Sequence, residues 1–175
     1  MISGSSLIRL SPETIIKPFD CEDADLNDFF LNESKHYLTE LLAVTYIIEN
    51  DKDTIAFFSV LNDKISAEDV DSKRIWKRIF QNKMPNRKHY HSYPAVKIGR
   101  LGVSSAYKGQ RIGREILDFI KGSFINKNKT GCRYITVDAY RESLVFYEKN
   151  DFIYMTTNDE GSDTRLMYFD LILIS

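Results

Sequence analysis

The chain has few of the residues that mark several classes of protein. Its 175 residues include only two cysteines, Cys21 and Cys132, which lie far apart in the sequence. Two isolated cysteines form neither a disulfide framework nor a zinc-ligand spacing, so no disulfide-stabilised fold and no metal site is predicted. Both residues are expected to be reduced thiols in a cytoplasmic protein.

Long apolar runs are also missing. No stretch approaches 18 consecutive apolar residues, and the first residues lack the charged segment and apolar run of a signal peptide. The sequence therefore predicts a soluble protein with no membrane association. A length of 175 residues and a hydrophobic content of 43% predict a single domain over residues 1–175 with one core.

The net charge of −1 is small, but the charges are unevenly distributed. Lys73 to His91 holds seven basic residues and no acidic residue, which leaves a net charge of −8 on the remaining chain. The spacing of apolar residues predicts an amphipathic helix over Glu68–Asn82, with Ile75, Trp76, Ile79 and Phe80 inward and Lys73, Arg74, Lys77 and Arg78 outward. Met84, Pro85 and Asn86 are expected to end this helix before a polar loop that contains Arg87, Lys88, His89 and His91. The basic segment is either a solvated helix face or a landing surface for a polyanion, which would gain affinity by releasing counterions.

The stretch from Lys97 to Phe152 is the most informative part of the sequence. Alternation over Ala95–Val103 predicts a strand, and Ser104, Ser105 and Gly109 predict a loop after it. The next residues predict a helix, a strand, a short helix and a further strand, carried by Arg111–Phe124, Tyr134–Val137, Leu144–Tyr147 and Phe152–Met155.

The rest of the chain supplies weaker patterns. A first strand is expected at Leu7–Leu10 and Thr14–Ile16, and a helix is expected to follow the acidic run that starts at Asp20. Leu42–Glu49 and Thr54–Leu61 predict a hairpin, in which Tyr46, Phe57 and Phe58 serve packing. No strand pattern is present between Asn62 and Pro94, and Arg165–Ile174 predicts a final strand that pairs with Phe152–Thr156.

The loop Lys108-Gly109-Gln110-Arg111-Ile112-Gly113 offers amides, two cations and two glycines at the start of a helix. The first amides of a helix have no partner inside it, and its dipole is positive there, so a diphosphate would bind favourably. An ordinary strand-to-helix turn would look the same. The loop has neither the G-x-G-x-x-G pattern of dinucleotide sites nor the GK[ST] of triphosphate sites.

Together, these residues resemble the GNAT superfamily of acyl-CoA-dependent N-acyltransferases. The family's loop has Gln or Arg, two residues, Gly, one residue, and Gly or Ala, which correspond here to Lys108, Arg111 and Gly113. The later FYEKNDF, from Phe146 to Phe152, resembles the family's F-Y-E-K-x-G-F. The resemblance implies an α/β fold of the α+β type. Its central sheet would be mixed and mostly antiparallel, with six to seven strands flanked by helices and a splayed fourth and fifth strand.

The N-terminal part is similar to one branch of this family. Its F-D-C-G-x-x-x-L-N-x-F-L opening is matched at Phe19, Asp20, Cys21, Leu26, Asn27 and Phe29. That branch includes bacterial toxins that acetylate the amino group of aminoacyl-tRNA, and relatives of unassigned substrate. The resemblance therefore implies acetyl-CoA and an amine acceptor as partners, and it leaves open tRNA bound through residues 73–91, a small antitoxin and a homodimer.

The resemblance also implies the roles of individual residues in a site that uses acetyl-CoA and releases coenzyme A. The backbone of Leu101 and Val103 would bind pantetheine, the loop from Lys108 to Arg114 would hold the pyrophosphate, and Tyr147 would act as general acid. The implied cofactor-binding residues are Leu101, Gly102, Val103, Lys108, Gly109, Gln110, Arg111, Ile112, Gly113, Arg114, Tyr140 and Phe146.

Two positions depart from the family pattern. Arg111 stands where glycine is common, and arginine does not easily adopt a positive φ. If the residue has helical angles this cost vanishes, and its guanidinium could reach a phosphate. Asp151 replaces a glycine after the second helix, so Asn150 or Asp151 is expected to adopt a left-handed turn, which both residue types tolerate.

The chemistry of Tyr147 suits the departure of a thiolate. A phenol has a pKa of about 10, above the roughly 8.5 of a thiol, so the phenol stays protonated at neutral pH and has a proton to give. The alternative is that Tyr147 only packs beside Phe146 and Phe152. The candidates for a general base are Glu142, Asp138, His36, His89 and His91, none of which stands out, and this favours a weakly basic acceptor amine.

Three other functions remain open at the level of sequence. The first is a toxin that acetylates aminoacyl-tRNA. The second is a non-catalytic nucleic-acid or protein binding module on a GNAT fold. The third is a protein that binds another phosphate ligand in the same loop. Retention of Gly109, Gly113 and Tyr147 argues against the binding module.

Overall fold

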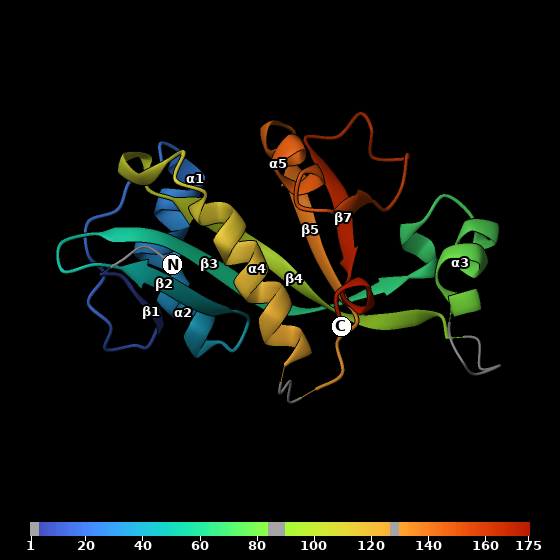
Figure 1. The fold of residues 1–175 in the computed structure, drawn as a ribbon, viewed down its shortest axis with the longest axis horizontal. Coiled ribbons are helices and arrows are strands. Elements are labelled where there is room, and N and C mark those ends of the chain that lie inside the picture. The colour runs from blue at the N-terminus through green and yellow to red at the C-terminus, as the bar shows by residue number, and fades with distance from the viewer. Residues whose placement is uncertain (1–3, 84–89, 127–129) are drawn as a thin grey trace. The chain divides into compact units, whose positions relative to one another are not determined.

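The computed structural model describes residues 4–83, 90–126 and 130–175, and within them it places one sheet with the strand order β1-β2-β3-β4-β5-β7-β6 (Figure 1). The pairs β1–β2, β2–β3, β5–β7 and β6–β7 are antiparallel, whereas β4 and β5 are parallel. This confirms the predicted mixed, mostly antiparallel sheet. The strands are β1 Ser6–Arg9, β2 Val44–Glu49, β3 Thr54–Ser66, β4 Ser92–Val103, β5 Tyr134–Tyr140, β6 Ile153–Tyr154 and β7 Thr164–Asp170.

The chain divides into two compact units. Unit 1 consists of Met1–Leu61 and Ile98–Gly122, and unit 2 consists of Asn62–Lys97 and Ser123–Ser175. Strands β3 and β4 each contribute residues to both units. The expectation of a single domain over the whole chain stays a prediction.

The sheet of unit 1 has helices on both faces. Neighbouring residues of β3 point to opposite sides of the sheet, so each of them packs against a different set of helices. The Phe57 ring stacks on Phe30 with ring centroids 4.4 Å apart, whereas the Phe58 ring meets Phe119 of α4 at 6.0 Å. Both phenylalanines of β3 are almost fully buried, as their predicted packing role requires. The helices of this unit are α1 Ala24–Asp28, a π-helical turn Phe29–Glu33, α2 Ser34–Thr39 and α4 Ile112–Ile125.

Several predicted boundaries were wrong. Strand β3 continues to Ser66 and β4 begins at Ser92, although no strand was expected between residues 62 and 94. In β3 the polar residues 62–64 alternate between exposed and half-buried positions, so the strand continues there without an apolar alternation. The expected strand at Thr14–Ile16 is absent because the Thr14 amide donates to the Ser11 carbonyl (3.1 Å) and closes a turn.

Unit 2 packs α3, which spans Lys73–Ile79, against an aromatic cluster on the sheet. Trp76 lies 4.7 Å from Phe80 and 5.5 Å from Tyr93, measured between ring centroids. The predicted inward face of this helix is confirmed, and its four basic side chains are exposed as predicted. The helix is shorter than expected because Ser72 caps it by accepting from the Ile75 amide (3.3 Å). The predicted helix end at residues 84–86 and the loop residues 87–89 lie outside the described residues.

The other face of the unit 2 sheet carries α5, which spans Leu144–Glu148. Phe152, which follows α5, lies with its ring centroid 5.8 Å from that of Phe169 in β7. The predicted pairing of the last two strands is confirmed at Ile153–Tyr168 and Tyr154–Met167. None of the described helices is long and apolar enough to cross a membrane.

The aromatic cluster of unit 2 holds buried polar atoms without a hydrogen-bond partner among the described residues. They are Trp76 Nε1 and the hydroxyls of Tyr93 and Tyr134. Burial is the main cause that raises the pKa of both tyrosines. A buried hydroxyl that gains no hydrogen bond has lost its hydration without compensation, so it lowers the stability of the fold.

We therefore expect Tyr134→Phe to raise the free energy of unfolding by about 1 kcal/mol, because it removes an uncompensated polar atom and keeps the ring. Urea denaturation measures the change. Thr136→Val is the matched control, since the buried Thr136 hydroxyl donates to Asp63 (2.5 Å) and its loss should destabilise by about 1–3 kcal/mol. A Tyr134→Phe variant that destabilises as much as the control would contradict the assignment.

Candidate functional site

The turn after β4 belongs to unit 1 and is held by main-chain hydrogen bonds. The Ser104 amide donates to the Ile55 carbonyl of β3 (2.9 Å), and the Ser105 amide donates to the Asp20 carbonyl (2.8 Å). A short 3-10 turn over Ser105–Tyr107 follows. The loop that was predicted to hold a diphosphate therefore starts from a backbone position fixed by two other segments.

Two residues of this loop have left-handed backbone angles. Gly109 has φ +79° and Arg111 has φ +64°. Arg111 therefore does not have the helical angles that would remove the strain, because the chain turns at this residue before α4 begins at Ile112. Its carbonyl already accepts the first helical bond, from the Glu115 amide (3.1 Å). A side chain in this conformation costs roughly 1–2 kcal/mol, which glycine would not pay.

The start of α4 offers unsatisfied amides. No residue in the described ranges accepts a hydrogen bond from the amides of Ile112, Gly113 or Arg114, as expected for the first turn of a helix. The side chains of Arg111 and Arg114 are exposed beside these amides. Amides and guanidinium groups at the positive end of a helix form a suitable site for a phosphate anion.

The cation Lys108 is already engaged. Its Nζ lies 2.8 Å from Glu22 Oε2, and this hydrogen bond is the main cause that raises the pKa of Lys108. Glu22 has φ +65°, a third left-handed position. The sequence analysis did not predict this contact. The signal was Glu22 itself, a charged residue at the position where the F-D-C-G pattern has glycine.

The remaining residues of the N-terminal motif build the turn that carries Glu22. Asp20 Oδ1 accepts from the Glu22 amide (2.8 Å) and from Asn27 Nδ2 (2.8 Å). The Asn27 side-chain oxygen accepts in turn from the Cys21 amide (3.0 Å). The acidic run is indeed a helix start, because Asp23 caps α1 by accepting from the Leu26 amide (3.0 Å).

Gly102 of β4 is closely surrounded by aromatic rings. A Cβ added there would meet Phe57 Cε1 at 2.7 Å and Phe19 Cζ at 3.3 Å. Its neighbours Leu101 and Val103 are half-buried. Packing therefore requires a glycine at position 102. Gly102 also lies in the predicted pantetheine site, where a residue without a side chain would leave the main chain accessible.

In unit 2, Tyr147 lies in the middle of a row of aromatic rings. Its ring centroid is 5.0 Å from that of Phe146 and 5.3 Å from that of Phe152, both edge to face, and the residue is 6% exposed. Burial raises the pKa of Tyr147 well above its ordinary value, so the hydroxyl is protonated at neutral pH. Its two predicted roles, general acid and packing, are both compatible with this position.

The end of α5 is formed by the residues of the second family motif. The Asn150 side chain donates to the Phe146 carbonyl (2.7 Å), and the Phe152 amide donates to the Tyr147 carbonyl (3.1 Å). Asp151 has φ +67°, which confirms the predicted left-handed turn. The motif therefore fixes the backbone on both sides of Tyr147.

The predicted candidates for a general base are exposed or paired. Asp138 Oδ2 lies 2.5 Å from Lys97 Nζ, at the place where the parallel pairing of β4 and β5 ends with Lys97–Thr136. Glu142, His36 and His91 are exposed, and His89 lies outside the described residues. No group of three or more His, Cys, Asp or Glu side chains in the described part of the chain could hold a metal ion.

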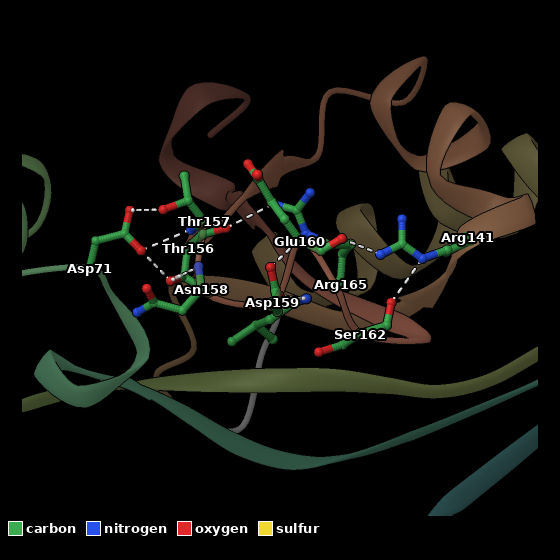
Figure 2. A network of polar contacts seen from close by, with 10 residues as sticks. Asp71, Arg141, Thr156, Thr157, Asn158, Asp159, Glu160, Ser162 and Arg165 are labelled. Atoms are coloured by element: carbon green, nitrogen blue, oxygen red, sulfur yellow. Dashed lines mark hydrogen bonds and ion pairs between the residues drawn. The ribbon is translucent and has the colours of Figure 1, made fainter.

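The loop between β6 and β7 is clamped to its surroundings on two sides (Figure 2). The Asp71 carboxylate accepts from the Thr157 amide (2.8 Å) and from the hydroxyls of Thr156 and Thr157. Asp159 of the loop also pairs with Arg165 of β7, with Oδ1 2.5 Å from Nε. The Asp71 bonds attach the loop to the segment that leads into α3.

The second clamp comes from the turn that joins β5 to α5. The Arg141 guanidinium donates to the Ser162 carbonyl (2.9 Å) and to the Glu160 carbonyl. Figure 2 shows Arg141 and Asp71 approaching the loop from opposite ends. The loop is therefore an ordered part of unit 2 between α3 and α5.

The structure thus groups the predicted site residues in two sets. The residues from Leu101 to Arg114 belong to unit 1 and surround the turn after β4. Tyr140, which is 45% exposed at the end of β5, belongs to unit 2 together with the half-buried Phe146 and the buried Tyr147.

Comparison with known proteins gives a family and a fold. A family model described as an acetyltransferase (GNAT) domain matches residues 43–154, more than half of the chain. Comparison with curated protein sequences finds no significant match.

Three similar solved structures illustrate the likeness in fold. One is a tyrosine-to-phenylalanine mutant of KacT, with 17% identity, a TM-score of 0.79, and coverage of 98% of this chain and 97% of that chain. A second is AtaT complexed with acetyl-methionyl-tRNAfMet, with 17% identity, a TM-score of 0.74, and coverage of 97% and 96%. A third is an AtaT mutant toxin bound to the C-terminus of the antitoxin AtaR and acetyl-CoA, with 15% identity, a TM-score of 0.74, and coverage of 97% and 95%.

The crowding at Gly102 generates a stability prediction. Gly102→Ala should lower the free energy of unfolding by about 1–3 kcal/mol, because its Cβ overlaps the Phe57 ring. Gly122→Ala is the matched control, since a Cβ at this position of α4 meets nothing within 4 Å and alanine should stabilise the helix by about 0.5–1 kcal/mol. Thermal or urea unfolding of the two variants measures both changes, and equal effects would refute the role of Phe57.

Proposed function

Because the chain belongs to the GNAT acetyltransferase family, we propose that it transfers the acetyl group of acetyl-CoA to a primary amine, with Tyr147 as general acid. The observation that carries the proposal is the turn before α4. It presents unsatisfied amides and an exposed Arg111 at the positive end of a helix, which suits the diphosphate of coenzyme A. The proposal treats residues 1–175 as one functional domain.

We assign the diphosphate and the pantetheine of the cofactor to residues of unit 1. The amides from Gly109 to Arg114 would hold the diphosphate, and the main chain of Leu101 and Val103 would bind the pantetheine amides as a neighbouring strand does. Gly102 keeps side-chain atoms away from this stretch of backbone. Tyr140 and Phe146, which belong to unit 2, remain proposed cofactor-binding residues through the family resemblance alone.

The proposed reaction is a direct transfer. The amine nitrogen attacks the thioester carbonyl carbon, the new C–N bond forms, and the C–S bond breaks with its electron pair on sulfur. The departing thiolate takes the Tyr147 proton, and the amine gives up its extra proton to solvent. Burial raises the pKa of Tyr147, so the phenol carries its proton at neutral pH when the thiolate forms, and it is also a weaker acid than an exposed tyrosine.

We expect Tyr147→Phe to lower kcat by about 100-fold or more, the usual contribution of a general acid, while the Kd for acetyl-CoA stays unchanged. Thiol release from acetyl-CoA measures kcat, and calorimetry measures Kd. Tyr168→Phe is the matched control, because Tyr168 is also buried in unit 2 but packs in the aromatic cluster around α3.

Four outcomes can be told apart by these measurements and by competition with ATP. Loss of kcat only in Tyr147→Phe supports the proposal. An unchanged kcat means that Tyr147 serves packing alone. A wild-type chain that binds no coenzyme A would favour a binding module on the same fold, and stronger competition by ATP than by acetyl-CoA would favour another phosphate ligand.

Aminoacyl-tRNA is the second, more specific candidate for the acceptor. It is favoured by the exposed basic face of α3, where Lys73, Arg74, Lys77 and Arg78 stand without an acidic residue among them. Such a face attracts a polyanion by counterion release. As a toxin of this kind, the chain would also be expected to bind a small antitoxin.

Replacing these four basic residues by glutamine should raise KM for aminoacyl-tRNA at least about tenfold at low salt and leave KM for a free amine unchanged. Acetylation of charged tRNA, deacylated tRNA and amino acid amides by the wild-type chain and by this variant measures the difference. Transfer to free amines alone would remove the tRNA candidate and keep the acetyltransferase.

A further inference from the structure

The charges around the turn before α4 are arranged unequally. Lys108 forms an ion pair with Glu22, and Arg114 Nε lies 3.9 Å from Asp118 Oδ2. Arg111 forms no ion pair with any described carboxylate. The three cations of the turn are therefore not equally available to an anion.

The Glu22–Lys108 pair is held in place by the backbone. The Asp20 carbonyl accepts from the Ser105 amide, and the Lys108 amide donates to the Ser105 carbonyl (3.3 Å). The Asp20 carboxylate also holds the Glu22 amide in its left-handed conformation. Because the Asp20–Ser105 hydrogen bond joins the segments that carry Glu22 and Lys108, the carboxylate is held within reach of the ammonium.

We propose that Glu22 is an internal competitor for the anion that binds this turn: it occupies Lys108 in the free protein and gives way when a diphosphate arrives. Arg111 then carries the main attraction for the diphosphate, and Lys108 contributes only what remains after Glu22 has been displaced. The inference rests on the proposed function, because it takes the diphosphate of coenzyme A as the anion.

Competition is the expected consequence of the exposure of both groups. The side chains of Lys108 and Glu22 are 51% and 66% exposed, so their attraction is screened by water and is weak enough to break. A purely structural ion pair would have the opposite effect, since its loss would loosen the turn and weaken cofactor binding. The sign of the change in affinity therefore separates the two roles.

The test measures the Kd for coenzyme A by calorimetry at low ionic strength. We expect Glu22→Gln to tighten binding about 2- to 5-fold, the range that an exposed ion pair supports. Glu22→Gly should tighten it equally, because it removes the same carboxylate and tolerates the left-handed angle. Asp25→Asn is the matched control, since Asp25 is exposed in the first turn of α1 and removes the same charge without a contact to Lys108.

A double-mutant cycle with Lys108→Gln isolates the competition. In the Lys108→Gln background, Glu22→Gln should no longer change the Kd for coenzyme A. Arg111→Gly, which keeps the left-handed backbone, should weaken binding more than Lys108→Gln does. Pantetheine, which lacks the diphosphate, should bind the wild-type chain and Glu22→Gln equally.

The outcomes separate this inference from the proposed function. If the wild-type chain binds coenzyme A but Glu22→Gln leaves the Kd unchanged or weakens binding, the competition is refuted and the acetyltransferase stands. Equal tightening in the Lys108→Gln background also refutes it, because the effect then does not pass through Lys108. If the wild-type chain binds no coenzyme A, the proposed function fails first.

Discussion

Two main-chain hydrogen bonds determine where the turn after β4 lies, and the candidate anion site of unit 1 depends on them. They join Ser104 to Ile55 and Ser105 to Asp20, so the turn is attached to β3 and to the N-terminal segment at once. Main-chain bonds of this kind place no demand on side chains. The loop from Lys108 onward can therefore vary in sequence while its backbone still starts from the same point.

This freedom is used at the left-handed positions. Glu22, Arg111 and Asp151 all have φ between +64° and +67°, and each occupies a position where the resembling motifs have glycine. For Glu22 and Arg111 this conformation costs roughly 1–2 kcal/mol relative to glycine, whereas aspartate tolerates it better. Two of them place a charge at the turn before α4, and strain of this kind is characteristic of functional sites. The Glu22 carboxylate and the Arg111 guanidinium bring one negative and one positive charge to this site. Glycines at positions 22 and 111 would bring neither.

Sequence patterns predicted the elements whose burial follows a simple period, and missed those whose geometry depends on partners. The apolar stripe of α4 is visible because Ile112, Ile116 and Ile120 recur on one face, and all three are buried. The extension of β3 through Asp63 could not be predicted from the local sequence, because the Thr136 hydroxyl that donates to Asp63 lies 73 residues away. The left-handed angle of Arg111 was also unpredictable, because arginine has no preference for it and only the turn imposes it.

The pairing of carboxylates in unit 2 bears on the kind of amine that the proposed reaction accepts. Asp138 is paired with Lys97, Asp159 with Arg165, and Asp170 with Arg133 through two bonds of 3.0 Å. Each of these carboxylates is already occupied by the N–H donors of its cation, so it is less available to contact an incoming amine. An acceptor that needs strong deprotonation, such as a lysine with a pKa of about 10.4, would find little help from these groups. An α-amino group with a pKa of about 7.7 is roughly one-sixth neutral at pH 7 and needs none, so the charge arrangement favours aminoacyl esters and peptide N-termini over lysine side chains.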